Sequence, residues 1–167
     1  MKPRVYLETS VIGYLTGRHS RNVVVSVHQD ITRAWWATRR NDFDLFVSLL
    51  VLREARDGDP SAANKRLDAI RGLPVLDMDE RVLFLATLIS KEAHLPSNAN
   101  DDALHIALAS THGMDYLLTW NCTHIANAEI RKHIDRACES VDADPPVICT
   151  PEELLGVYSH VEKPRHR

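Results

Sequence analysis

Five side chains whose oxygen atoms could bind a metal ion lie within apolar runs or at their ends. They are Glu8, Glu54, Asp101, Asp102 and Asn121. Carboxylate and amide oxygens are the ligands that hard cations such as Mg²⁺ and Mn²⁺ prefer. A cation held in this way lowers the pKa of a bound water and stabilises charge on a leaving oxygen, which suits the hydrolysis of a phosphodiester. The residues therefore predict a hydrolytic Mg²⁺ or Mn²⁺ site, provided that the fold brings them together.

Each of these residues also has a simpler interpretation. Glu8 would suit the start of a helix, because the helix dipole favours an acid there. Glu54 could pair with a neighbouring arginine on the surface, and Asn121 is a natural turn residue. One acid of the pair Asp101 and Asp102 could cap its helix. Two adjacent acids at a buried helix start repel each other unless a positive charge lies between them, and a metal ion would supply that charge.

Other kinds of site find less support. A zinc site at Cys122 and His124 lacks the usual second pair of ligands, and the three cysteines form no CxxC pair. We interpret His105 and His124 as hydrogen-bonded structural residues. The sequence contains no P-loop, dinucleotide fingerprint, nucleophile elbow or HExxH motif.

The elements that must position these residues follow from the apolar pattern. Short strand-like runs alternate with helical segments, which is typical of an α/β domain with a mainly parallel sheet. Right-handed crossovers then produce a three-layer α/β/α sandwich. Ligands of such sheets bind beyond the carboxyl ends of the strands, which is where Glu8 and Asn121 stand.

The expected bounds can be stated for each element. The strands are residues 4–7, 44–48, 74–76, 116–119 and 147–149. The helices are residues 11–15, after cap hydroxyls at Thr9 and Ser10, and 22–40, 49–56, 60–71, 79–94, 100–112 and 126–139. We expect a single domain over residues 1–158 and a flexible tail over residues 159–167.

Length and charge limit the class of protein. A chain of 167 residues fits one domain. A formal net charge of −3 argues against binding nucleic acid through a uniformly basic surface, so such a role would need a local site. No apolar run approaches the roughly 20 residues of a membrane helix. We therefore expect a cytoplasmic protein that does not enter a membrane.

Four segments of the chain resemble, in order and spacing, the signature blocks of PIN domains. They are residues 5–12, the segment around Glu54, and residues 101–107 and 117–121. The run Asp-Ala-Leu-His-Ile-Ala at 102–107 is the most specific part of a resemblance that covers about residues 4–150. The resemblance implies an α/β/α fold and metal-dependent ribonuclease activity. Many bacterial single-domain members are VapC-like toxins of type II toxin–antitoxin systems, each held inactive by an antitoxin protein.

The resemblance also assigns residues to roles. It places Glu8, Glu54, Asp102 and Asn121 at the four acidic positions, with Thr9 and Thr119 as supporting hydroxyls and Asp101 as an additional metal neighbour. The first acid of the family is usually Asp, so Glu8 adds one methylene that the pocket must accommodate. Asn121 keeps an oxygen but lacks a charge, so a second metal should bind more weakly unless Asp101 substitutes.

Two functions from different classes remain open. In the first, an endoribonuclease, Glu8, Glu54 and Asp102 hold Mg²⁺ or Mn²⁺, and Asn121 and Asp101 orient the attacking water or a second metal. In the second, a catalytically weakened PIN fold serves as an RNA- or protein-binding module, which the residues at 8 and 121 motivate. A hydrolase of small phosphates is a third interpretation, and it would require a closed pocket.

Three tryptophans bear on partners. Trp35 shares a helical stripe with Ile31, which predicts a core position. Trp36 points elsewhere, and we expect it at a contact with a second copy of the chain or with an antitoxin. We interpret Trp120 as packing at the sheet edge, although it could stack on an RNA base.

Overall fold

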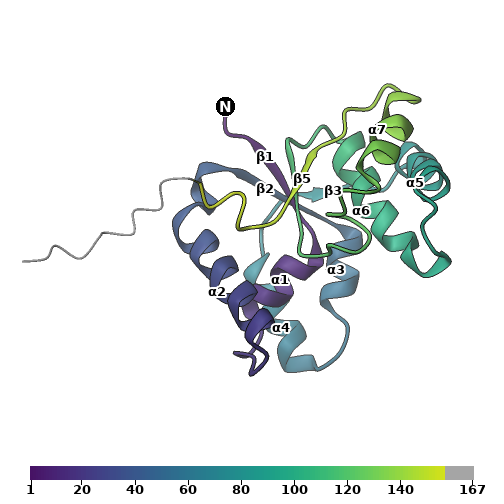
Figure 1. The fold of residues 1–167 in the computed structure, drawn as a ribbon. Helices are drawn as coiled ribbons and strands as arrows, with labels where there is room; N and C mark the ends of the chain where they lie inside the picture. The colour runs from purple at the N-terminus through teal and green to yellow at the C-terminus, as the bar shows by residue number, and fades with distance from the viewer. Residues whose placement is uncertain (157–167) are drawn as a thin grey trace, which may run out of the picture.

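The structure, a computed structural model, describes residues 1–156. Within them the chain forms five strands and seven α-helices, arranged as an α/β/α sandwich (Figure 1). All strands are parallel, in the order β3-β2-β1-β4-β5. The predicted fold class is confirmed. The predicted tail at 159–167, and the last two residues of the predicted domain, lie outside the described residues.

The bounds of the elements follow. The strands are β1 (Arg4–Leu7), β2 (Asp44–Ser48), β3 (Val75–Leu76), β4 (Tyr116–Leu118) and β5 (Val147–Cys149). The α-helices are α1 (Thr9–Thr16), α2 (Val23–Thr38), α3 (Leu49–Ala55), α4 (Pro60–Ala69), α5 (Glu80–Glu92), α6 (Asn100–Thr111) and α7 (Arg131–Glu139). Two 3₁₀ helices, η1 (Arg40–Asp42) and η2 (Ser97–Ala99), complete the list.

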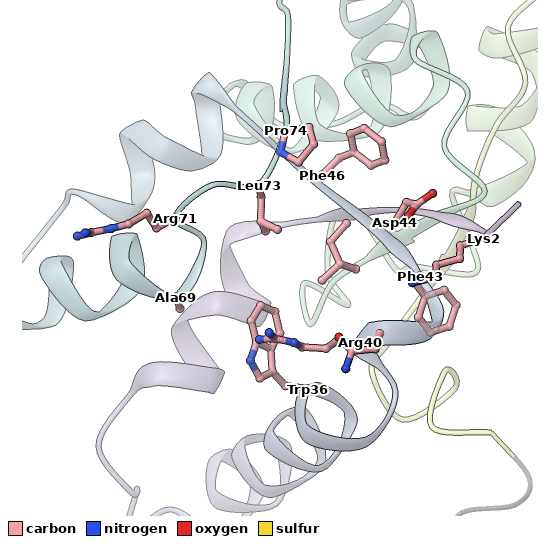
Figure 2. Close-up of a pocket in the computed structure, with 12 residues that line it drawn as sticks. Lys2, Trp36, Arg40, Phe43, Asp44, Phe46, Ala69, Arg71, Leu73 and Pro74 are labelled. Carbon is pink, nitrogen blue, oxygen red and sulfur yellow. The ribbon is translucent and has the colours of Figure 1, made fainter.

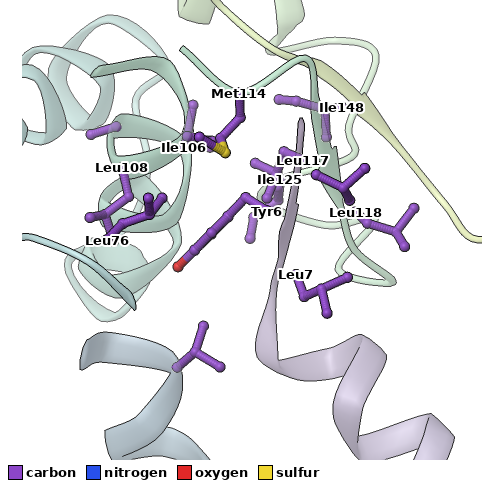
Figure 3. Close-up of a cluster of buried hydrophobic side chains, with 14 of the residues drawn as sticks. Tyr6, Leu7, Leu76, Ile106, Leu108, Met114, Leu117, Leu118, Ile125 and Ile148 are labelled. Carbon is purple, nitrogen blue, oxygen red and sulfur yellow. The ribbon is translucent and has the colours of Figure 1, made fainter. Parts of the chain in front are cut away.

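The sheet is covered on both faces. Figure 1 shows α1, α2 and α4 gathered on one side of the sheet and α5, α6 and α7 on the other. The central strands β1 and β4 consist almost wholly of buried apolar residues, as a parallel sheet covered on both faces requires. Figure 3 shows Leu117 of β4 with Tyr6, Ile106 and Met114 on one side of the sheet, and Leu118 on the other side with Leu7.

Two predicted element starts are wrong. Helix α1 begins at Thr9 and is capped by the side chain of Glu8, not by the hydroxyls of Thr9 and Ser10, because the longer carboxylate reaches back to accept the Ser10 N–H. Helix α7 begins at Arg131, not at 126. Residues 121–130 form turns instead, in which the Asn121 and Asn127 side chains accept backbone N–H groups and so compete with a helix.

The strand order defines where a ligand would bind. The chain passes from β1 to β2 and β3 on one side and then returns to β4 and β5 on the other, so the order reverses between β1 and β4. In open parallel sheets this switch point, at the carboxyl ends of the strands, is the usual ligand site. The Glu8 N–H donates to the Leu118 carbonyl at 3.0 Å, which ties the ends of β1 and β4 together there.

The described helices and the cysteines bear on the class of protein. None of the described helices combines the length and the apolarity needed to cross a membrane. Cys122, Cys138 and Cys149 are free cysteines.

Candidate functional site

Two carboxylates and one imidazole from three elements meet at the switch point. Glu8 follows β1, Glu54 lies in α3 and His105 lies in α6, and their ligand atoms are all within 4.8 Å of one another. His105 Nε2 lies 3.1 Å from Glu54 Oε1 and 4.0 Å from Glu8 Oε1. Glu8 and His105 are buried and Glu54 is partly exposed, so the cluster opens to solvent on the Glu54 side. The structure thus brings the predicted pair Glu8 and Glu54 together, with a histidine between them.

Glu8 is held by a dense set of hydrogen bonds. Its Oε2 accepts from the hydroxyls of Thr119, at 2.7 Å, and Ser10, while its Oε1 accepts from the Ser10 N–H at 3.1 Å. Because each carboxylate oxygen offers two lone pairs, Oε1 retains one, and Oε1 is the oxygen that faces His105. The pocket therefore accommodates the extra methylene of Glu8, and Oε1 can offer its remaining lone pair to a cation.

The predicted supporting hydroxyls have different environments. Thr119 donates to Glu8 and accepts the Asn121 N–H at 2.9 Å, so it links two predicted site residues. The Thr9 hydroxyl is buried, and it makes no hydrogen bond of normal geometry within residues 1–156. It lies near enough to Glu54 to lower the pKa of that carboxyl.

Asp102 and Asn121 form a second group with His124. Asn121 Nδ2 donates to Asp102 Oδ1 at 2.9 Å, and His124 Nδ1 lies 2.9 Å from Asp102 Oδ2. The Asn121 Oδ1 accepts the backbone N–H of His124, which settles the orientation of the amide. Asn121 therefore contacts Asp102 directly, and its expected role in orienting water or a second metal stays a prediction.

Asp101 lies apart from both groups. It is exposed and forms an ion pair with Arg53 at 2.7 Å, and neither it nor Asp102 caps α6. The repulsion between adjacent acids is relieved because the two side chains diverge, one to Arg53 and the other to His124. The structure thus provides a reason for this pair of acids that needs no metal between them.

Charge and burial shift the pKa values of the site. Burial raises the pKa of Glu54, but its hydrogen bond and attraction to His105 outweigh burial and hold that pKa below its ordinary value. Burial lowers the pKa of His105, yet the hydrogen bond to Glu54 and the charges of Glu8 and Glu54 raise it above its ordinary value. Burial raises the pKa of Asp102 despite the opposing contact with His124.

The Glu54–His105 pair predicts a pH window for stability. A lowered pKa makes Glu54 stabilising above its ordinary value of 4.5, and this contribution is lost as pH falls through the folded-state pKa. A raised pKa makes His105 stabilising below its ordinary value of 6.5, and this contribution is lost as pH rises through the folded-state pKa. The side chain of His105→Gln cannot titrate. We therefore expect the free energy of unfolding of the metal-free wild type to exceed that of His105→Gln by the largest amount between pH 4.5 and pH 6.5.

Urea unfolding of the two proteins across pH 4 to 9 measures this difference. The difference in free energy of unfolding should shrink on both sides of the window. A difference that stays constant from acid to alkaline pH would show that His105 contributes only by packing.

Three partners of the site were not identified from the sequence. Ser10 holds Glu8, His105 holds Glu54 and His124 holds Asp102. One signal was available, because His105 lies three residues after Asp102 and so on the same face of α6. Both histidines are hydrogen-bonded, as the sequence led us to expect.

The donor atoms fit a hard divalent cation. Glu8 Oε1 and the partly exposed Glu54 carboxylate are two oxygen donors close together, and the unpaired Thr9 hydroxyl adds a third oxygen near Glu54. Oxygen donors of this kind suit Mg²⁺ or Mn²⁺. Cys122 is exposed and belongs to no such group among the described residues, so the zinc interpretation finds no support.

Two tryptophans have surroundings that bear on their expected roles. Trp120 is buried, donates from Nε1 to Thr32 at 2.8 Å and stacks on His28 with ring centroids 4.0 Å apart, which confirms the packing interpretation. Trp36 is half-buried beside a cavity of about 410 Å³, with the Arg40 guanidinium 4.7 Å from its ring centroid (Figure 2). Its expected role at a protein contact remains a prediction.

Comparisons of the chain with models of protein families, with curated proteins and with solved structures give no significant match.

Proposed function

We propose that this protein is a metal-dependent endoribonuclease that hydrolyses RNA phosphodiester bonds. The observation that carries the proposal is the meeting of Glu8 and Glu54 at the switch point of a parallel sheet. Asp102 is close enough for the charges of Glu8 and His105 to act on its pKa. Carboxylates gathered from separate segments in this way would suit a hydrolytic Mg²⁺ or Mn²⁺ site.

The side chains divide the chemistry between them. Glu8 Oε1 and the Glu54 carboxylate would hold the cation, which supplies a bound water of lowered pKa and neutralises charge on the leaving oxygen. Asp102, fixed by Asn121 and His124, orients the attacking water and accepts its proton. Its raised pKa suits a proton acceptor, because a general base works best when its pKa lies nearer the working pH.

The biological setting in the proposal rests on the resemblance to PIN domains. Residues 5–12, 101–107 and 117–121, with the segment around Glu54, carry that resemblance. On this basis we propose a VapC-like toxin that acts in the cytoplasm, forms a homodimer and is neutralised by an antitoxin protein.

One observation favours the binding-module alternative. Protein donors already satisfy most lone pairs of Glu8, and Asp102 has a partner on each oxygen. Carboxylates satisfied in this way need no cation to be stable in the fold. The alternative predicts RNA binding without metal-dependent cleavage.

Incubation of the purified protein with a mixed single-stranded RNA tests the proposal. Cleavage is expected with Mg²⁺ or Mn²⁺ and not with EDTA. Binding of RNA without cleavage under either metal would favour the binding module. Faster hydrolysis of a small phosphodiester than of RNA would instead favour a hydrolase of small phosphates.

A further inference from the structure

A buried chain of hydrogen bonds leads from the core to the candidate site. The Tyr6 hydroxyl lies 2.8 Å from Ser48 Oγ and 2.8 Å from His105 Nδ1, and the other ring nitrogen of His105 lies 3.1 Å from Glu54 Oε1. Ser48, Tyr6 and His105 are all buried. Figure 3 shows the Tyr6 ring among apolar side chains, with its oxygen directed away from Met114 and Ile148. Polar groups in such surroundings are constrained to these partners.

The carboxylate determines which nitrogen of His105 carries hydrogen. Nε2 lies within 3.3 Å of both Glu54 oxygens, and an Nε2 without hydrogen would direct a lone pair at the lone pairs of the carboxylate. Nε2 therefore donates to Glu54, whether the ring is neutral or positive. In the neutral ring Nδ1 then accepts from Tyr6, which in turn accepts from Ser48.

The start of α3 supports the same direction of hydrogen donation, from Ser48 to Tyr6 and from Tyr6 to His105. Ser48 is the N-cap of this helix, and its Oγ accepts the Val51 N–H at 3.2 Å. An oxygen that already accepts at the cap still has its hydroxyl hydrogen to give, and Tyr6 is its partner. The orientation of the histidine is thus specified by strand β1 and by the end of β2.

We propose that His105 is a positioning residue, held by Tyr6 and Ser48, that fixes the Glu54 carboxylate beside Glu8 and does not itself bind a cation. Nε2 bonded to hydrogen has no lone pair for a metal, and Nδ1 is covered by Tyr6. The cation is then held by carboxylate oxygens although a histidine lies within 4.8 Å of them. The part of the inference that concerns a bound cation rests on the proposed function, whereas the hydrogen-bond chain does not.

Variants of His105 and Tyr6 separate positioning from packing. His105→Gln retains an N–H near the position of Nε2 and should keep most of the Mn²⁺ affinity, whereas His105→Leu retains bulk alone. Tyr6→Phe keeps the ring and removes the hydroxyl that orients His105. We expect His105→Leu and Tyr6→Phe to weaken Mn²⁺ binding by about 10- to 100-fold, the usual effect of losing an outer-shell partner. Tyr116→Phe, on neighbouring β4, is the control, because Tyr116 is partly exposed and takes no part in this chain of hydrogen bonds.

Two spectroscopic measurements decide the inference. In the metal-free protein with ¹⁵N-labelled histidine, NMR should show His105 with hydrogen on Nε2, with His105→Gln identifying the signal. Electron spin-echo spectroscopy of the Mn²⁺-loaded protein should show no directly bound histidine nitrogen. The inference would be overturned if NMR showed no hydrogen on Nε2 of His105, or if a histidine nitrogen were bound to Mn²⁺. It would also be overturned if His105→Leu and the wild type bound Mn²⁺ with equal affinity. If Mn²⁺ does not bind at all, the proposed function fails, while NMR of the metal-free protein still tests the position of the hydrogen.

Discussion

Asp102→Asn is expected to lower metal-dependent cleavage of RNA by at least about 100-fold, the lower end of what a positioned general base contributes. The substitution removes the charge of the residue that orients the attacking water in the proposed mechanism. It also replaces one acceptor oxygen by an NH₂ group, which would face a donor on Asn121 or on His124. Initial rates of cleavage of a fixed RNA at saturating Mn²⁺ measure the effect.

Asp101→Asn provides the informative comparison. The two acids are adjacent in sequence, but Asp101 is exposed and paired with Arg53, and an exposed ion pair contributes little. We expect Asp101→Asn to cleave at nearly the wild-type rate. A loss equal to that of Asp102→Asn would mean that Asp101 joins the metal site, as the family resemblance suggested. Glu92→Gln, which changes an exposed acid of α5, controls for a general effect of lost charge.

Leu117→Ala is expected to lower the free energy of unfolding by about 2–5 kcal/mol. Leu117 is fully buried in β4, an internal strand of the sheet that lies between β1 and β5. Figure 3 shows it beside Tyr6 and Ile125, so truncation leaves a cavity that neighbours on several elements would have to fill. Urea unfolding followed by circular dichroism measures the change.

Val147→Ala is the matched control for this prediction. It shortens a β-branched residue of the neighbouring strand β5, but Val147 is 55% exposed. A change of less than about 1 kcal/mol is expected, because little apolar surface is lost from the core. Equal losses in the two variants would contradict the assignment of Leu117 to the central core.

The backbone of the fold could be predicted closely from the sequence. All five predicted strands agree with the structure to within one residue, and β1, β2 and β5 agree at both ends. The reason is local, because each strand is a short apolar run between turn or cap residues, and a parallel sheet covered on both faces needs such runs. The starts of helices α1 and α7 were the exceptions. At α7 the side chains of Asn121 and Asn127 accept backbone N–H groups in turns, which the apolar periodicity of the sequence does not reveal.

The sequence also predicted which side chains stand at the ligand edge. Glu8 and Asn121 directly follow two strands, and parallel strands with right-handed connections must place their carboxyl ends at one edge. The meeting of Glu8 with Glu54 followed from this placement together with the family resemblance. These are consequences of chain direction and topology, which local patterns specify.

Only the tertiary structure decided how each acid is used. Glu54 meets His105 across 51 positions of the sequence, and Asp102 meets His124 across 22, so both contacts depend on how α6 packs beside α3 and the loop after β4. Asp101 and Asp102 are chemically identical and adjacent, yet helix geometry turns one to Arg53 in solvent and the other to Asn121 in the site. Sequence spacing fixes neither direction, because a side chain's partner is determined by the packing of whole elements, which arises from the burial of apolar surface far from the site.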